Sequence, residues 1–366
     1  MSTHKVTVVE VHSRPHPNAD RLRLVSVSGW QVVVGKGDFY EGELAAYVPP
    51  DYVVPIDIVP KAMADILAKQ CKIVDGRNQA EDGYVKGFRV STKKFRGEWS
   101  QGLLLKLKPD DLLYGGNVDK HGKAELQAGD DVMAYLGIGH WEPPVESSFE
   151  GETEMVPMLP AVQSAMETYQ APVPKFDVEP YRNEPELIPE GTMVQITEKI
   201  DGMQARYMWD GNRFWAGSKS LWRKASPNSP WWQMLERTPH LKDFLRDHKH
   251  LVVYGEIYGS GVQDETYGLK NGDKCLKLFD MFEGGKYMSP TFAMSLADEN
   301  CIPWVPVLAT TQFHPEEHLK MADGLSSLGN GSIREGIVIR PLDGRVDGHG
   351  NRVVLKVVSD VYLSKQ

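Results

Sequence analysis

An acidic, proline-rich stretch near the middle of the chain limits how the chain can fold. Residues 138–190 hold 11 acidic and 2 basic side chains, while the residues on either side of that stretch contain as many acids as bases. Because proline and like charges keep a segment extended or loosely packed, we expect 138–184 to connect two domains, 1–137 and 185–366. The net charge of −9 lies in this stretch and does not argue against a basic surface on either domain.

The first domain contains short apolar or β-branched runs separated by turn residues. These runs lie at 6–11, 22–27, 30–34, 44–48, 87–90 and 103–107. Runs of this length and spacing are typical of the strands of a small barrel or sandwich. One predicted helix, at 60–69, interrupts them.

The chain has none of the sequence marks of a secreted or membrane protein. Its apolar runs are too short to span a bilayer, and its N-terminus lacks a signal-peptide pattern. Three widely spaced cysteines are typical of a protein in a reducing compartment. We therefore expect a cytoplasmic protein without a membrane partner.

The first domain also carries cations interleaved with aromatic rings. Between positions 86 and 99, the cations are Lys86, Arg89, Lys93, Lys94 and Arg96, and the rings are Phe88, Phe95 and Trp99. Cations that bind phosphates and rings that stack on bases are used in nucleic-acid grooves of barrel domains. The alternative is a solvated strand edge whose lysines prevent pairing with another edge. We favour a nucleic-acid surface that includes Arg89, Lys93, Lys94 and Arg96.

The second domain contains a lysine at the end of an alternating run. Residues 195–207 read Gln-Ile-Thr-Glu-Lys-Ile-Asp-Gly-Met-Gln-Ala-Arg-Tyr. This pattern predicts two strands joined at a tight Asp-Gly turn, a hairpin with Lys199 at its rim. Partial burial beside other cations would lower the pKa of Lys199 and free its amine as a nucleophile. The alternative is a solvated surface charge.

Further charged residues follow Lys199 at the ends of predicted strands. In chain order they are Asp201, Lys219, Glu256, Glu335 and Lys356. The strands and helices around them alternate unevenly, which indicates an α+β domain of antiparallel sheets flanked by helices. The chain lacks both the Gly-x-x-x-x-Gly-Lys-Ser/Thr loop and a Gly-x-Gly-x-x-Gly turn after a strand. The P-loop and dinucleotide-binding routes to nucleotide chemistry are therefore excluded.

Five short motifs in this domain resemble those of the covalent nucleotidyltransferases, the superfamily of DNA ligases, RNA ligases and mRNA capping enzymes. They lie, in order, at 199–202, 254–259, 278–281, 335–340 and 354–357. In the first domain, residues 16–22 read His-Pro-Asn-Ala-Asp-Arg-Leu and look like the signature of the tRNA-binding OB module of phenylalanyl-tRNA synthetase and related proteins. The alternative for this segment is a turn that only fixes the geometry of the barrel.

Two features narrow the resemblance within the superfamily. Gln204 stands where DNA ligases and capping enzymes usually carry arginine, and the barrel precedes the catalytic domain. The chain therefore resembles the ATP-dependent RNA ligases that have an N-terminal OB module and seal 3′-OH/5′-phosphate nicks. This implies an α+β multidomain fold, with an N-terminal OB-like β-barrel and a C-terminal nucleotidyltransferase domain.

The resemblance also implies roles for individual residues. Lys199 would attack the α-phosphorus of ATP and form a covalent lysyl-AMP, with Lys356 and Glu335 completing the catalytic set. Residues expected to bind the nucleotide are Glu198, Ile200, Asp201, Gly202, Lys219, Glu256, Phe279 and Val338. Asp201, Glu256 and Glu335 would hold a metal, although Glu256 could instead hold a ribose hydroxyl. Lys219 replaces an arginine of many relatives, and we expect Arg223 to share its contact with substrate phosphates.

The predicted function follows from these roles. We expect a monomeric RNA ligase that uses ATP and Mg²⁺ or Mn²⁺ to seal nicks in duplex RNA or an RNA/DNA hybrid with an RNA 3′-OH end. One alternative is a capping-type guanylyltransferase, which would be labelled by GTP. Another is a non-catalytic tRNA- or RNA-binding OB protein, which would form no covalent nucleotide adduct.

Overall fold

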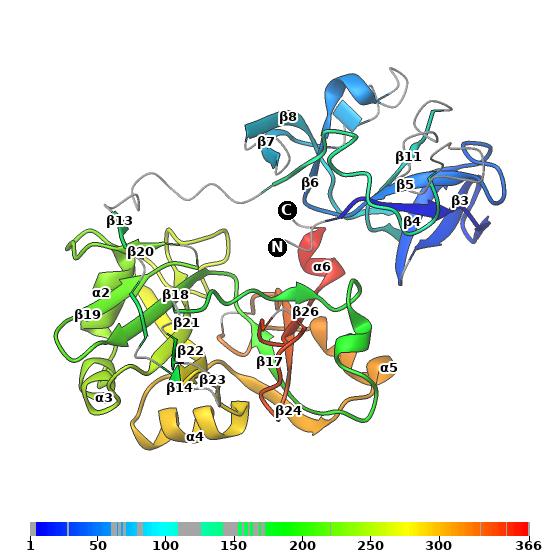
Figure 1. The fold of residues 1–366 in the computed structure, drawn as a ribbon. Coiled ribbons are helices and arrows are strands. Elements are labelled where there is room, and N and C mark those ends of the chain that lie inside the picture. The colour runs from blue at the N-terminus through cyan, green and yellow to red at the C-terminus, as the bar shows by residue number, and fades with distance from the viewer. Residues whose placement is uncertain are drawn as a thin grey trace. The chain divides into compact units, whose positions relative to one another are not determined.

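The computed structural model describes most of the chain (Figure 1). The described residues are 5–27, 29–59, 64, 67–68, 71–78, 83–108, 126–141, 153–155, 157–159, 162–163, 168–169, 173–219, 221–329, 331–348 and 350–364. The chain divides into an N-terminal unit, Met1–Pro144 with Leu363–Gln366, and a C-terminal unit, Val145–Tyr362. Among the described residues, no helix combines the length and the apolar character needed to cross a membrane.

The N-terminal unit is built mainly from β-strands. They are β1 (Thr7–Glu10), β2 (Ser13–His16), β3 (Ala19–Val27), β4 (Trp30–Gly35), β5 (Leu44–Val48), β6 (Tyr52–Pro55), β7 (Ile73–Asn78), β8 (Gly83–Arg89), β9 (Lys93–Phe95), β10 (Glu98–Ser100), β11 (Leu103–Lys106) and β12 (Gly139–His140), with a 3₁₀ turn, η1, at Ile56–Ile58. Every apolar run that we predicted as a strand falls on one of these strands. The helix predicted at 60–69 lies largely outside the described residues.

Apolar alternation explains how these strands pack. Strands β6, β7, β8 and β12 form a closed barrel, β1-β5-β11 and β2-β3-β4 form three-stranded sheets, and β9 pairs with β10. In the β1-β5-β11 sheet, Ala46 stands opposite both Val8 and Leu105. All three side chains are buried in one cluster, as expected for strands that place alternate residues on the core side.

The C-terminal unit combines sheets with short helices. Its strands are β13 (Thr153–Glu154), β14 (Val162–Gln163), β15 (Thr168–Tyr169), β16 (Glu179–Pro180), β17 (Met193–Lys199), β18 (Met203–Trp209), β19 (Phe214–Gly217), β20 (Trp222–Arg223), β21 (Val252–Gly259), β22 (Lys274–Glu283), β23 (Lys286–Tyr287), β24 (Val307–Gln312), β25 (Gly336–Pro341) and β26 (Leu355–Val358). The helices are α2 (Pro230–Arg237), α3 (Leu241–Asp247), α4 (Pro290–Glu299), α5 (Pro315–His318) and α6 (Asp360–Leu363), with 3₁₀ turns η4 (Pro185–Leu187) and η5 (Leu319–Ala322).

Two sheets dominate this unit (Figure 1). The larger has seven strands in the order β13-β20-β19-β18-β21-β22-β23, and the smaller has five in the order β16-β26-β25-β17-β24. Pairing is antiparallel except between β16 and β26. Helices α2, α3 and α4 pack on the larger sheet, where Trp231, Leu245 and Ala293 share an apolar cluster with Val253 and Met281. These antiparallel sheets with flanking helices are the α+β arrangement predicted from the sequence.

The chain crosses from one sheet to the other immediately after Lys199. Strand β17 pairs with β24 and β25, whereas β18 pairs with β19 and β21. The predicted hairpin is therefore wrong, because both edges of each strand are occupied by other partners. A Cβ atom on Gly202 would lie 2.4 Å from the carbonyl oxygen of Ile257. Glycine is needed here for a close approach to β21.

Part of the expected connection packs into the C-terminal unit. Leu159, Val173 and Phe176 are buried in the same cluster as Tyr254 and Phe279. The ring centroid of Phe176 lies 5.1 Å from those of both Tyr254 and Phe279. Burial of these apolar side chains fixes the later part of the stretch in place, despite its prolines and acidic residues.

Candidate active site

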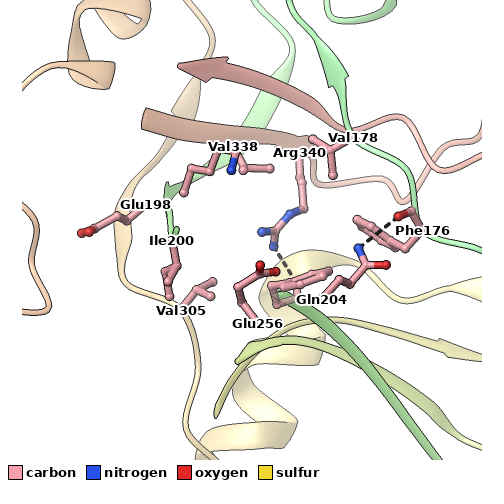
Figure 2. Close-up of a pocket in the computed structure, with 11 residues that line it drawn as sticks. Phe176, Val178, Glu198, Ile200, Gln204, Glu256, Val305, Val338 and Arg340 are labelled. Atoms are coloured by element: carbon pink, nitrogen blue, oxygen red, sulfur yellow. Dashed lines mark hydrogen bonds between the residues drawn. The ribbon is translucent and has the colours of Figure 1, made fainter. Parts of the chain in front are cut away.

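An open pocket lies between the two sheets of the C-terminal unit, next to the crossing after Lys199 (Figure 2). It encloses about 460 Å³, including its open mouth. Its lining comprises Phe176, Val178, Glu198, Lys199, Ile200, Gln204, Glu256, Phe279, Val305, Val338 and Arg340. Six of these were predicted as site residues, namely Glu198, Lys199, Ile200, Glu256, Phe279 and Val338. A largely apolar wall with a few convergent charged groups is typical of a ligand site.

Lys199 is the last residue of β17, and its side chain meets a carboxylate from the segment before β25. The Lys199 Nζ atom lies 2.5 Å from Oε1 of Glu335. Burial alone would lower the pKa of Lys199, but the negative charges of Glu335, Glu256 and Asp201 outweigh it and raise the pKa. The expected fall in the pKa of Lys199 is therefore wrong, because the nearby carboxylates stabilise the ammonium form.

Together with burial, the charge of Glu335 raises the pKa of the other two predicted metal ligands, Asp201 and Glu256. Burial, followed by the charge of Glu335, raises the pKa of Asp201 to about 6. Burial also raises the pKa of Glu256 to about 8, and the charges of Glu335 and Asp201 add to the shift. The carboxylates of Asp201 and Glu256 thus resist ionisation, and a bound cation would favour their charged forms.

The donor atoms fit a metal that is held only in part by protein. The Oε2 atom of Glu335 is buried and has no hydrogen-bond partner among the described residues, so it is a hard oxygen ligand available to a cation. Among the described residues, no group of three or more acidic, histidine or cysteine side chains has the spacing of a complete metal site. Mg²⁺ usually keeps water and substrate phosphate oxygens as ligands, and such a mode matches these residues.

Asp201 is fixed by a segment that the sequence analysis did not identify. Its backbone N–H donates to the hydroxyl of Tyr267 at 2.7 Å, and its Oδ2 accepts from the backbone N–H of Glu265 at 3.2 Å. The side chain of Tyr362, in α6, also hydrogen-bonds to Asp201 and counteracts the rise in its pKa. Tyr267 and Tyr362 follow the motifs at 254–259 and 354–357, but nothing in their spacing showed that they would contact Asp201.

Glu198 has its carboxylate engaged elsewhere. It is 2% exposed and accepts hydrogen bonds from the hydroxyl of Ser326 and, at 2.7 Å, from the backbone N–H of Ser327. Figure 2 shows the carboxylate turned away from Glu256 and Arg340. The Glu198 carboxylate is therefore engaged by residues 326 and 327, and the nucleotide contact predicted for this residue stays a prediction.

A buried cationic network supports the aromatic wall of the pocket. Arg340 Nη1 donates to the carbonyl oxygen of Phe279 at 2.5 Å, and its Nη2 donates to Oγ1 of Thr197 at 3.0 Å. Burial lowers the pKa of Arg340 to about 10. Next to it, Arg352 pairs with the buried carboxylate of Asp280 at 3.2 Å. Arg340 was missed as a site residue, although the alternation in β25 places it on the same side as Val338.

Two further predicted cations, Lys356 and Lys219, lie near Lys199. Lys356 is in β26, opposite Val338 of β25. Burial, followed by the charges of Lys199 and Lys219, lowers the pKa of Lys356. Lys219 is half exposed and pairs with Asp177 at 2.5 Å. The six charged residues predicted from their order thus form one electrostatic group.

Two of the predicted nucleic-acid contacts are buried. Arg89 is 9% exposed, donates to Asp51 Oδ1 at 2.6 and 2.9 Å, and lies over the ring of Trp141 at 3.4 Å. Arg223 is 7% exposed and lies over the ring of Trp231 at 5.1 Å. We correct both predictions, because these guanidinium groups are packed into their own units and are not presented to a nucleic-acid backbone. Phe88 is also buried and offers no surface for base stacking.

Comparisons with known proteins agree with this geometry. Residues 192–358 match the family model described as RNA ligase, and residues 5–107 match an OB-fold domain model. A comparison with curated protein sequences found no match.

Solved structures of Naegleria gruberi RNA ligase match the whole chain. A variant with ATP and Mn has a TM-score of 0.76 at 24% identity, over 99% of both chains. A structure with PPi has a TM-score of 0.74 at 25% identity, over 100% of this chain and 99% of that one. A further variant with ATP and Mn reaches 0.75 at 25% identity, over 99% and 98%. The expected OB fold and the α+β multidomain class are confirmed.

Proposed function

We infer that this chain, which joins an OB-fold domain to an RNA ligase domain, is an ATP-dependent RNA ligase. We propose that it seals 3′-OH/5′-phosphate nicks through a covalent lysyl-AMP at Lys199. The observation that carries this proposal is the contact of Glu335 with Lys199, which lines a pocket with an aromatic wall. A lysine held there, with other cations and carboxylates around it, suits attack on a nucleotide phosphate.

In the first step, the Lys199 amine attacks the α-phosphorus of ATP. A nitrogen–phosphorus bond forms, and the bond to the β-phosphate oxygen breaks, so pyrophosphate leaves. The ammonium form of Lys199 must first lose a proton, and Oε1 of Glu335 is the acceptor already in hydrogen-bond contact. Lys356 offers positive charge for the negative charge that develops on the α-phosphate oxygens.

A divalent metal belongs to this step as a cofactor. Mg²⁺ or Mn²⁺ supplies positive charge to the phosphates and to the carboxylates that otherwise hold Lys199 in its ammonium form. We propose Asp201, Glu256 and Glu335 as the residues that hold it, directly or through water. The unpartnered Oε2 of Glu335 supports this assignment.

The adenosine of ATP suits the apolar part of the pocket. Phe279 can stack on the purine, and Ile200 and Val338 lie in the same lining. Glu256 also lines the pocket, and the alternative to a metal contact for its carboxylate is a ribose hydroxyl. We include Gly202 among the nucleotide-binding residues because of its close approach to Glu256 and β21. Lys219 remains a candidate for a phosphate contact at the open side.

The second and third steps use the activated nucleotide. The 5′-phosphate of the nick attacks the phosphorus of lysyl-AMP, so that the nitrogen–phosphorus bond breaks and AMP is joined to the RNA end through an anhydride. The 3′-OH then attacks the 5′-phosphate, a phosphodiester forms, and AMP leaves. The substrate we propose is a nick in duplex RNA or an RNA/DNA hybrid with an RNA 3′-OH. A monomer suffices for this, with the OB-fold domain binding the duplex.

The decisive experiment is labelling with ATP that carries ³²P at the α-phosphate, followed by a denaturing gel. With Mn²⁺ or Mg²⁺ present, the chain should become labelled, and EDTA should prevent it. Lys199→Ala should abolish the label, while Lys242→Ala, which removes a lysine in a surface pair with Glu236, should leave it unchanged. A label that survives Lys199→Ala, or that appears with GTP and not with ATP, would overturn the proposal.

Nick sealing is tested separately with two nicked duplexes that differ only in the sugar of the 3′-OH strand. The proposal expects a sealed product with an RNA 3′-OH and little or none with a DNA 3′-OH. Equal sealing of both duplexes would contradict the proposed substrate and leave the lysyl-AMP step standing.

A further inference from the structure

The segment His16-Pro17-Asn18-Ala19-Asp20 binds a hairpin far along the chain. His16 Nε2 lies 2.9 Å from the carbonyl oxygen of Phe95, and Asn18 Nδ2 donates to the carbonyl oxygen of Arg96 at 3.0 Å. The backbone N–H of Asn18 donates to His16 Nδ1 at 3.0 Å. His16 Nδ1 is thus an acceptor, which leaves the proton on Nε2 to donate to Phe95. Both side chains therefore hold the same turn.

The turn that His16 and Asn18 contact has an unusual backbone conformation. Strands β9 and β10 are joined by Arg96 and Gly97, with φ angles of +50° and +98°. Two positive φ angles in a two-residue loop are typical of a type I′ hairpin. Arginine is disfavoured at such an angle, so the bond from Asn18 to the Arg96 carbonyl helps to select this conformation. A Cβ atom on Gly97 would lie 3.2 Å from Asn18 Nδ2, which shows how closely the two segments fit.

The hairpin displays two exposed cations. Lys94 and Arg96 are exposed, and the Lys94 ammonium lies 4.8 Å from the centre of the Trp99 ring. A ring face covered by an ammonium group supports that charge and is not open to a stacked base. The one acid in the hairpin, Glu98, accepts from Gln31 Nε2 at 3.1 Å, and Gln31 Oε1 accepts from the exposed Arg14 at 2.7 Å. Asp20, in the holding segment, is also exposed.

We propose that His16 and Asn18 are positioning residues, which hold Lys94 and Arg96 in place to bind the phosphodiester backbone of the RNA substrate. The proposal deepens the proposed function and rests on it, since it takes RNA as the ligand. Exposed cations recognise phosphates, so the contact is independent of base sequence and weakens as salt rises. Residues 16–20 would then contribute to nucleic-acid binding by fixing a turn, so the two interpretations given for this segment in the sequence analysis describe one mechanism.

Binding of the full chain to a fluorescent nicked RNA duplex, measured by anisotropy at several salt concentrations, tests this. Lys94→Ala and Arg96→Ala should each weaken binding and each reduce the slope of log affinity against log salt by about 1. Asn18→Ala should weaken binding by about three- to tenfold, the effect of one lost hydrogen bond acting on the hairpin. Lys5→Ala, which removes an exposed cation at the start of β1, should leave affinity nearly unchanged.

A double-mutant cycle separates positioning from a general structural effect. In the Lys94→Ala/Arg96→Ala background, adding Asn18→Ala should cause no further loss of affinity. An equal loss in both backgrounds, or no loss from Asn18→Ala in the wild-type background, would overturn the proposal. Should Asn18→Ala fail to fold, Gly97→Ala perturbs the same turn from the other side and should weaken binding in the same non-additive way.

Labelling of Lys199 by ATP provides the independent readout. Asn18→Ala should leave labelling within about twofold of the wild-type chain, since Asn18 and Lys199 lie in different units. A large loss of labelling in Asn18→Ala would overturn a positioning role confined to RNA. Absence of labelling in the wild-type chain would instead contradict the proposed function, while the binding cycle would still report on the hairpin.

Discussion

Lys199 and Glu335 are 136 residues apart in the sequence, yet their charged atoms lie 2.5 Å apart. The pairing of β17 with β25 explains this, because Lys199 stands opposite Gly336, the neighbour of Glu335. The same contact raises the pKa of Lys199 and so favours the ammonium form of the lysine. Its reactivity then depends on what neutralises or replaces the carboxylates around it.

Replacement of Glu335 should therefore stop the first step more than it weakens ATP binding. Glu335→Gln removes the nearest proton acceptor and an available metal ligand while keeping the size of the side chain. We expect the rate of Lys199 labelling to fall by about 10²- to 10⁴-fold, the usual contribution of a positioned acid or base. Single-turnover labelling with α-³²P ATP measures it, and Glu236→Gln, at an exposed surface pair, is the matched control. A rate within threefold of the wild-type chain would remove Glu335 from the catalytic set.

Replacement of Phe279 should affect nucleotide affinity. Phe279→Leu keeps an apolar side chain in the pocket and removes the flat ring that can stack on adenine. We expect the KM for ATP in the labelling reaction to rise by about tenfold, in line with the energy of one base–aromatic stack. Phe292→Leu, at a side chain that is 58% exposed on α4, should leave the KM unchanged. An unchanged KM in Phe279→Leu would place the purine elsewhere.

The order of charged residues in the sequence was sufficient to identify residues that lie close together in the structure. Lys199 ends β17, while Glu256 and Lys356 lie within β21 and β26, and apolar or alternating residues made those strands predictable. The sequence could not show which strands are neighbours, since β17 and β18 read as a hairpin although each pairs with other strands. Pairing depends on contacts between distant segments, which a local pattern does not contain.

Burial was the other property that the sequence could not supply. Arg89 and Arg223 read as free cations, but each packs on a tryptophan in the interior of its unit. Phe176 lies in a stretch whose prolines and acids predict a connection, yet it contributes to the pocket wall. For Arg89 and Phe176, a partner far away in the chain, Trp141 and Phe279 respectively, decides the environment of the side chain.

The buried pair of Asp280 and Arg352 should be important for stability. Asp280 carries the negative charge that faces both Arg352 and Arg340, so Asp280→Asn leaves two buried guanidinium groups without it. We expect a loss of about 3–5 kcal/mol in the free energy of unfolding, as for other buried pairs that lose one partner. Urea titration of the C-terminal unit measures it. Asp243→Asn, at an exposed pair on α3, should cost less than about 1 kcal/mol, and equal effects of the two changes would contradict the argument.

The crossing between the sheets gives the sharpest test of how the backbone positions Lys199. Gly202→Ala introduces a Cβ atom 2.4 Å from the carbonyl oxygen of Ile257, which belongs to the backbone of β21 and cannot rotate away. The segment that carries Asp201 must therefore shift, and we expect Lys199 labelling to fall by more than about tenfold, with destabilisation of about 1–3 kcal/mol. Gly348→Ala is the control, because its added Cβ atom would meet nothing within 4 Å and its backbone favours no left-handed angle. If Gly202→Ala labelled as fast as Gly348→Ala, the close approach of the crossing to β21 would not determine the position of Lys199.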